Sequence, residues 1–191
     1  AHSSLTGMAR LALVSLALFS SAAAQSCGSI PNAEAAGFLK VHNDLRTKIS
    51  LGSFYAGSRR MPAAKTPIPQ LTWDCALEKS AQAYANRCVF AHSTNRVNVG
   101  ENLYTKWSSA VLTTTGAGAE ASNSWAKEFQ DYGWSSVKLT VASFNTGIGH
   151  ATQMAWAKTT KLGCGIARCQ GNKQILTVCH YQDAGNYINQ N

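Results

Sequence analysis

The spacing of apolar residues predicts helices in the first two thirds of the chain. Apolar side chains share one helical face over three ranges, residues 32–49, 74–88 and 119–131. Asn32 and Asp74 stand where helix caps are favoured, and Gly133 follows the third range. A shorter helix is expected to begin near His150.

The pattern changes near the C-terminus, where residues 162–168 and 174–181 form two β-like runs. The turn-forming residues 169–173 join them, which predicts an antiparallel hairpin. Residues 97–104 are ambiguous, and the Gly-, Ser- and Thr-rich residues 108–118 form a loop or a weak helix. Because helices come early and strands late, the expected fold class is α+β, with helices packed against an antiparallel sheet.

The N-terminal residues predict export. Residues 8–24 combine a basic start, an apolar run and a small-residue cleavage site, which is the pattern of a secretory signal peptide. Residues 1–7 have no role in that pattern and are expected to be a leader of vector or upstream origin. Residues 25–191 then form a single secreted, extracellular domain, in which no apolar run is long enough for a transmembrane segment.

Composition narrows the remaining choices. The chain has 191 residues, with 17 Lys+Arg against 9 Asp+Glu, so its formal charge is +8. The basic residues are scattered without a stripe or aromatic interleaving, so nucleic acid is not expected as a partner. The six cysteines in an exported domain predict three disulfides, and cysteine number alone leaves 15 pairings open.

Two histidines and two glutamates are the candidates for chemistry. Glu101 follows His92 by nine residues, Glu128 lies on an otherwise aromatic helix face, and His150 stands at a helix start. Spacing alone does not bring these four together. No G-x-S-x-G nucleophile motif occurs in the sequence.

Several blocks resemble the CAP superfamily of cysteine-rich secretory proteins, venom antigens and plant pathogenesis-related proteins. Gly149–Thr159 and Val178–Tyr187 resemble its two signatures. Further matching blocks are Val41–Arg46, Trp73, Ala85–Ser93, Gly100–Leu103 and Trp125–Glu128. The resemblance covers about residues 27–191 and is greatest to single-domain nematode activation-associated secreted (venom-allergen-like) proteins. Ala151 and Asp183 depart from the usual pattern, where most members have an aromatic residue and many have Pro.

The resemblance implies a three-layer α-β-α sandwich with a central antiparallel sheet. It also implies a cleft tetrad of His92, Glu101, Glu128 and His150. Imidazoles suit Zn²⁺ or another divalent cation, so His92 and His150 are the expected metal ligands, although no cofactor is expected to be required. The family further implies the disulfides Cys27–Cys88 and Cys164–Cys179, which leaves Cys75 with Cys169.

Three interpretations of the tetrad stay open: a metal-dependent protease or esterase, a metal-binding cleft without turnover, and a buried network that satisfies its own hydrogen bonds. Among these interpretations we expect one without turnover, so the protein is not expected to be an enzyme. The histidines outside the tetrad, His42 and His180, are expected to be structural, as are Asn43 and Arg46.

The expected role is that of a binding or immunomodulatory protein at the host–parasite interface. The resemblance implies as partner an unidentified host protein, or a lipid such as a sterol or fatty acid. Residues 107–125 are the candidate region for an apolar ligand. The oligomeric state is expected to be a monomer or a weak homodimer.

Overall fold

The structure is a computed structural model that describes residues 25–134 and 137–190. The expected leader (1–7) and signal peptide (8–24) lie outside the described residues. The elements, in chain order, are α1 (Asn32–Ser50), β1 (Tyr55–Ala56), β2 (Arg59–Arg60), β3 (Thr72–Trp73), α2 (Cys75–Ala85), β4 (Gly100–Trp107), α3 (Ala117–Tyr132), α4 (Val141–Phe144), α5 (Gly149–Ala155), β5 (Lys161–Cys169) and β6 (Gln174–Gln182). None of the helices in this part of the chain could cross a membrane.

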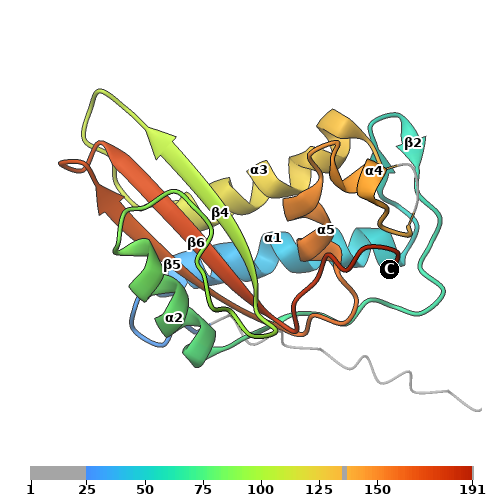
Figure 1. The fold of residues 1–191 in the computed structure, drawn as a ribbon, viewed down its shortest axis with the longest axis horizontal. Helices are drawn as coiled ribbons and strands as arrows, with labels where there is room; N and C mark the ends of the chain where they lie inside the picture. Colours follow the sequence, from blue (N-terminus) through green and yellow to red (C-terminus); the bar gives the residue numbers. More distant parts are fainter. Residues whose placement is uncertain (1–24, 135–136, 191) are drawn as a thin grey trace, which may run out of the picture.

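The expected α-β-α sandwich is confirmed. The central sheet has the strand order β3-β5-β6-β4. Helix α2 covers one face of the sheet, and α1, α3 and α5 form the layer on the other face (Figure 1). Strands β4, β6 and β5 are antiparallel as predicted, but the short β3 runs parallel to β5, so the sheet is only partly antiparallel.

The predicted helices occur, with changes at their ends. Asp74 caps α2 by accepting from the backbone N–H groups of Ala76 and Leu77, as expected. Asn32 does not cap α1, because Pro31 occupies the cap position and the Asn32 side chain accepts from the backbone of Ser26 instead.

Helix α3 begins two residues earlier than predicted, at Ala117. The buried Glu34 carboxylate from α1 accepts from the backbone N–H groups of Gly116 and Gly118. A distant side chain thus satisfies donors that a helix start leaves open, which local sequence could not reveal. The ambiguous residues 97–104 contribute to β4, and the predicted hairpin is formed by β5 and β6.

The disulfides are Cys27–Cys75, Cys88–Cys169 and Cys164–Cys179. Of the three expected pairs, Cys164–Cys179 is confirmed, whereas Cys27–Cys88 and Cys75–Cys169 are wrong.

The N-terminal segment explains the difference. Glu78, in the first turn of α2, accepts from the backbone N–H groups of Cys27 and Ser29. These bonds hold Cys27 beside Cys75, the first residue of α2, while Cys88 follows the other end of that helix and meets Cys169 at the end of β5.

Arg46 and Asn43 are structural, as predicted. The buried Arg46 guanidinium donates to the backbone carbonyls of Pro69, Met154, Trp156 and Thr159. Asn43 donates to and accepts from the backbone of Leu71. Both side chains join α1 to loops that carry few backbone bonds of their own.

Candidate functional site

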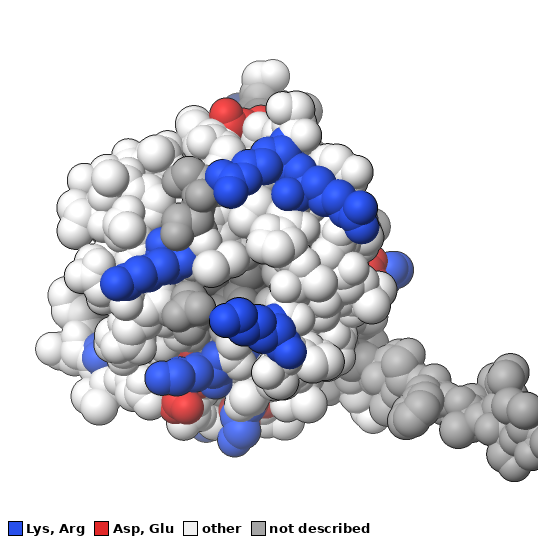
Figure 2. Space-filling model, turned by 90° about the vertical axis from the view of Figure 1, so that its right-hand side faces the viewer, with Lys and Arg blue, Asp and Glu red and all other residues white. Residues whose placement is uncertain are grey.

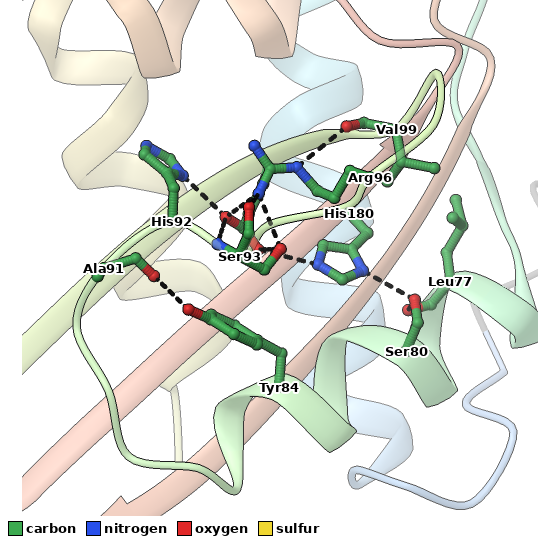
Figure 3. Close-up of polar contacts among 10 residues, drawn as sticks. Leu77, Ser80, Tyr84, Ala91, His92, Ser93, Arg96, Val99 and His180 are labelled. Atoms are coloured by element: carbon green, nitrogen blue, oxygen red, sulfur yellow. Dashed lines mark hydrogen bonds and ion pairs between the residues drawn. The ribbon is translucent and has the colours of Figure 1, made fainter.

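The first half of the candidate site is a hydrogen-bond cluster around Glu101 on β4 (Figure 3). Its buried carboxylate accepts from His92 Nδ1 at 2.8 Å and from the backbone N–H and hydroxyl of Ser93 at 2.9 and 2.7 Å. Arg96 Nη1 lies 2.8 Å from the same carboxylate, and His180 Nε2 lies 3.1 Å from it. Five donors therefore converge on one carboxylate.

These donors fix the protonation state of Glu101. Burial raises the pKa of the carboxyl, but the hydrogen bonds from His180, His92 and Ser93 outweigh that effect and hold it well below its usual range. Because an ionised carboxylate only accepts, the Nδ1 atom of His92 carries the proton. The exposed His92 ring then presents its Nε2 lone pair to solvent.

Arg96 also shapes the loop that holds His92 and Ser93. Its guanidinium donates to the backbone carbonyls of Ser93 and Val99 as well as to Glu101. The loop before β4 is thus closed around the carboxylate by a single side chain. This second role makes the Glu101 cluster a structural unit as well as a candidate site.

The second half of the site is the pair His150 and Glu128. His150 Nδ1 lies 2.5 Å from the Glu128 carboxylate, which also accepts from the backbone N–H groups of His150 and Ala151 at 2.9 and 3.0 Å. The His150 ring stacks on Trp125, with ring centroids 6.0 Å apart. Glu128 thus orients the ring and satisfies the start of α5.

Asn102, the neighbour of Glu101 on β4, connects the two pairs. Its amide donates to the backbone carbonyl of His150 at 3.1 Å and to Tyr181 Oη at 3.0 Å. Tyr181 Oη is 2.8 Å from His42 Nε2. The structure therefore arranges the four predicted residues as two His–Glu pairs, and Asn102 connects the strand of the first pair to the backbone of His150.

His42 is structural, as predicted. Its Nδ1 donates to the carbonyl of Phe38, and burial lowers its pKa to about 3. His180 is also buried, and both of its ring nitrogens are hydrogen-bonded, Nε2 to the tetrad member Glu101 and Nδ1 to Ser80 Oγ at 2.8 Å (Figure 3), which fits the expected structural role. Strand register places His180 opposite Glu101, and only the pairing of β4 with β6 reveals this neighbour.

Ser93 and Arg96 also belong to the Glu101 cluster, and no sequence pattern predicted either of them. The signal available for Ser93 was its position directly after His92, but adjacency along the chain does not predict a shared acceptor. Arg96 had no distinguishing pattern, because an arginine in a loop before a strand is most often solvated.

The site offers two imidazole ligands for a metal ion. In both pairs the carboxylate holds Nδ1, which leaves Nε2 of His92 and of His150 for coordination. Both glutamates are already engaged by several donors. Among the described residues, no group of three or more His, Cys, Asp or Glu is arranged to hold a metal.

An apolar cavity of about 460 Å³ lies away from this cluster. Its walls come from the end of α1, the loop 61–68, the end of α5 and the side chains of Trp134, Val137 and Leu139. Lys65 is the single charged residue in its lining. The cavity is thus formed outside residues 107–125, the expected apolar-ligand region, where Trp107 and Val111 are exposed to solvent.

Trp156 is the notable residue of this cavity. Its side chain lines the cavity and is only 5% exposed, yet its indole Nε1 has no hydrogen-bond partner in the described structure. A buried donor without an acceptor costs free energy. Trp156 therefore combines a side chain that lines the cavity with a buried, unsatisfied donor.

Comparison with known proteins places this geometry in a family. The model of the cysteine-rich secretory protein family, CAP, matches residues 39–181. The chain belongs to the CAP family. The match includes both His–Glu pairs, the first signature segment and the start of the second, Val178–Tyr181.

The relatives of this CAP protein include venom and nematode proteins. It is 38% identical over 164 residues to venom allergen 5 of Rhynchium brunneum, covering 80% of this chain and 68% of that protein. It is also 38% identical to the Ancylostoma secreted protein of Ancylostoma caninum, over 79% of this chain and 36% of that protein. The chain thus spans about a third of the length of the Ancylostoma protein.

Solved structures agree with the fold. The structure of BmVAL-1 superposes with a TM-score of 0.82 at 35% identity, over 87% of this chain and 84% of that one. NaASP2, crystallised with Zn²⁺, superposes with a TM-score of 0.79 at 34% identity, over 88% of each chain.

Proposed function

We propose that this CAP protein is an extracellular binding protein that takes a fatty acid or a sterol into the cavity at Trp156. The proposal is carried by an apolar cavity that Trp156 lines, together with the buried indole N–H of the same residue, which has no partner in the described structure. An apolar molecule with one hydrogen-bond acceptor would bury its surface against the lining and satisfy that donor. Fatty acids and sterols both have this chemistry, and the cavity volume is in the range of small-molecule sites.

Export and a host partner are part of the same proposal. Three disulfides fit an oxidising compartment, and a relative from Ancylostoma caninum is named a secreted protein. A secreted carrier of this kind would act on a host by withdrawing a lipid or by binding a host protein. We further propose that it acts as a monomer or a weak homodimer.

The properties of Glu101 favour binding over hydrolysis. A general base needs a pKa near the working pH, whereas this carboxyl is held well below its usual range. Its oxygens are also occupied by five donors, which leaves it poorly placed to accept a proton from water. The alternative of a metal-dependent protease or esterase therefore has less support.

Fluorescent lipids test the proposal directly. We expect cis-parinaric acid or dehydroergosterol to bind saturably, and Trp156→Phe to weaken that binding about fivefold through loss of one hydrogen bond. Ala64→Phe, which fills the cavity, should abolish it. Trp107→Phe is the matched control, because Trp107 is exposed and outside the cavity.

Two results would contradict the proposal. Absence of saturable binding for both probes would exclude the lipid-carrier function. If Trp107→Phe lost binding while Trp156→Phe kept it, the binding site would instead lie in residues 107–125. Circular dichroism of each variant separates loss of binding from loss of fold.

Metal binding at the two His–Glu pairs is a second candidate function. The free Nε2 atoms of His92 and His150 support it, as does the relative NaASP2, which was crystallised with Zn²⁺. We expect isothermal titration with Zn²⁺ to give heat that disappears in His92→Ala/His150→Ala. His42→Ala is no suitable control because His42 is buried, so Thr94→Ala on the exposed loop serves instead.

A further inference from the structure

The end of the molecule that contains the apolar cavity is built from segments without acidic residues. No Asp or Glu occurs between Asp44 and Asp74, or between Asp131 and Asp183. Every residue that lines the cavity belongs to one of these two segments. The cavity walls therefore come from chain that contributes positive charge and no negative charge.

Cations surround the cavity. Lys65 lines it, and Lys138 and Lys158 directly follow lining residues. Six exposed cations lie within or directly beside the stretches of chain that supply the lining residues: Lys48, Arg59, Arg60, Lys65, Lys138 and Lys158. Figure 2 shows this end of the molecule, where Lys and Arg side chains cross the surface and acidic side chains are seen only towards its edges.

Two of the acidic residues that border the two segments are paired within their own helices. Asp44 forms an ion pair with Lys40, and Asp131 forms one with Lys127. Each carboxylate is thus engaged by a lysine of its own helix. The positive charge of the cavity end has no acidic counterpart within its own segments.

Exposed apolar side chains lie among these cations. They are Leu51, Tyr55, Val137, Val141 and Phe144. Strand β2, formed by Arg59 and Arg60, lies at the same end of the molecule as α4, which carries Val141 and Phe144 (Figure 1). A sulfated glycan would use only the cations, whereas a lipid surface uses cations and apolar side chains together.

We propose that this cationic end, defined by the six cations and five apolar residues above, docks on an anionic phospholipid bilayer. The cations would meet the negatively charged headgroups, and the apolar side chains would enter the headgroup region. Docking in this orientation turns the cavity towards the lipid. The docking surface is inferred from charge and exposure alone. Only the transfer of a ligand from the bilayer into the cavity rests on the proposed function.

Vesicle sedimentation tests the docking. We expect the protein to partition onto phosphatidylcholine vesicles that contain phosphatidylserine and to release as salt rises. Neutralising three cations in Lys65→Gln/Lys138→Gln/Lys158→Gln should lower the partition coefficient about a hundredfold. The matched control, Lys79→Gln/Arg168→Gln/Lys173→Gln, makes the same charge change on exposed residues of α2 and the β5–β6 hairpin.

The control decides whether the surface or the net charge matters. Equal losses in the two triple variants would overturn the proposal, because net charge alone would then explain binding. Equal partition onto vesicles with and without phosphatidylserine would overturn it as well.

A second pair of variants separates a bilayer from a glycan. Val137→Ser/Val141→Ser should weaken vesicle binding about tenfold and leave heparin binding unchanged, since both side chains are exposed and apolar. Heparin binding with no vesicle binding would assign the surface to a glycan. Binding of cis-parinaric acid without vesicles is measured in parallel, so failure of the cavity and failure of the docking surface give different results.

Discussion

Buried and half-buried glutamates in this protein act as acceptors for backbone N–H groups that no secondary structure satisfies. Glu34 accepts at the start of α3, Glu128 at the start of α5, and Glu78 from the N-terminal segment. Glu101 accepts from the backbone of Ser93 in the same way. Since the chain has only nine acidic residues, nearly half of them hold the fold together at these points.

His42 provides a prediction at the scale of one residue. Burial lowers its pKa from 6.5 to about 3, so the folded protein keeps the ring neutral while the unfolded chain protonates it. Its contribution to stability is complete above pH 6.5 and decreases as the pH falls towards 3. Between pH 6.5 and pH 5 the free energy of unfolding should fall by about 2 kcal/mol through this residue.

Urea denaturation at pH 6.5 and pH 5 measures this change. His42→Asn should lose stability at both pH values and lack this part of the pH dependence. Tyr181→Phe removes the hydroxyl partner of His42 but leaves the ring buried, so it should keep the wild-type difference. A His42→Asn protein with an unchanged difference would show that other groups cause it.

At the scale of elements, two glycines in β5 allow α2 to lie directly on the sheet. A Cβ atom at Gly163 would come within 2.2 Å of the Glu78 backbone, and one at Gly165 within 2.3 Å of the Gln82 backbone. Real side chains do not make such contacts, so α2 would have to move away. The Leu162–Gly165 segment therefore has a packing role that neither charge nor periodicity indicates.

Gly165→Ala tests this packing. We expect it to lower the free energy of unfolding by about 3 kcal/mol, because the obstacle is helix backbone and has no alternative rotamer. Arg168→Ala on the same strand is exposed and should change stability by less than about 0.5 kcal/mol. Thermal and chemical denaturation measure both. Equal stability of Gly165→Ala and wild type would contradict the close approach of α2.

The elements show what sequence can and cannot predict. Helix α2 and the β5–β6 hairpin were predicted because their caps, turns and periodicity are local. The parallel pairing of β3, the position of His180 against Glu101 and the start of α3 depend on partners distant in sequence. Disulfide pairing is of the same kind, since it required knowing that Glu78 holds the N-terminal segment beside Cys75.

At the scale of the whole molecule, the two faces of the sheet are stabilised differently. The layer of α1, α3 and α5 packs over a large apolar core that includes Phe38, Trp125 and Phe129. The α2 layer has a much smaller core, in which α2 contributes Ala81 and Ala85. Disulfides attach both ends of this layer, through Cys75 at the start of α2 and Cys88 shortly after its end. Covalent bonds therefore compensate for limited apolar burial.

Hydrogen exchange tests this division. The variant Cys27→Ala/Cys75→Ala/Cys88→Ala/Cys169→Ala should lose amide protection first in α2, while the β5–β6 hairpin and α1 stay protected. Chain entropy for loops of 48 and 81 residues gives about 4 kcal/mol for each of the two disulfides, so the α2 layer should open well before the rest.

The control for this experiment is Cys164→Ala/Cys179→Ala, which removes the bridge between β5 and β6. That bridge joins strands already paired along nine residues each, so α2 should keep its protection when it is removed. Uniform loss of protection in the fourfold variant would show that the two layers unfold as one unit. Peptide mapping of the wild type without reduction checks the underlying pairs, because it should find Cys27 linked to Cys75 at the start of α2 and Cys169 linked to Cys88 after its end.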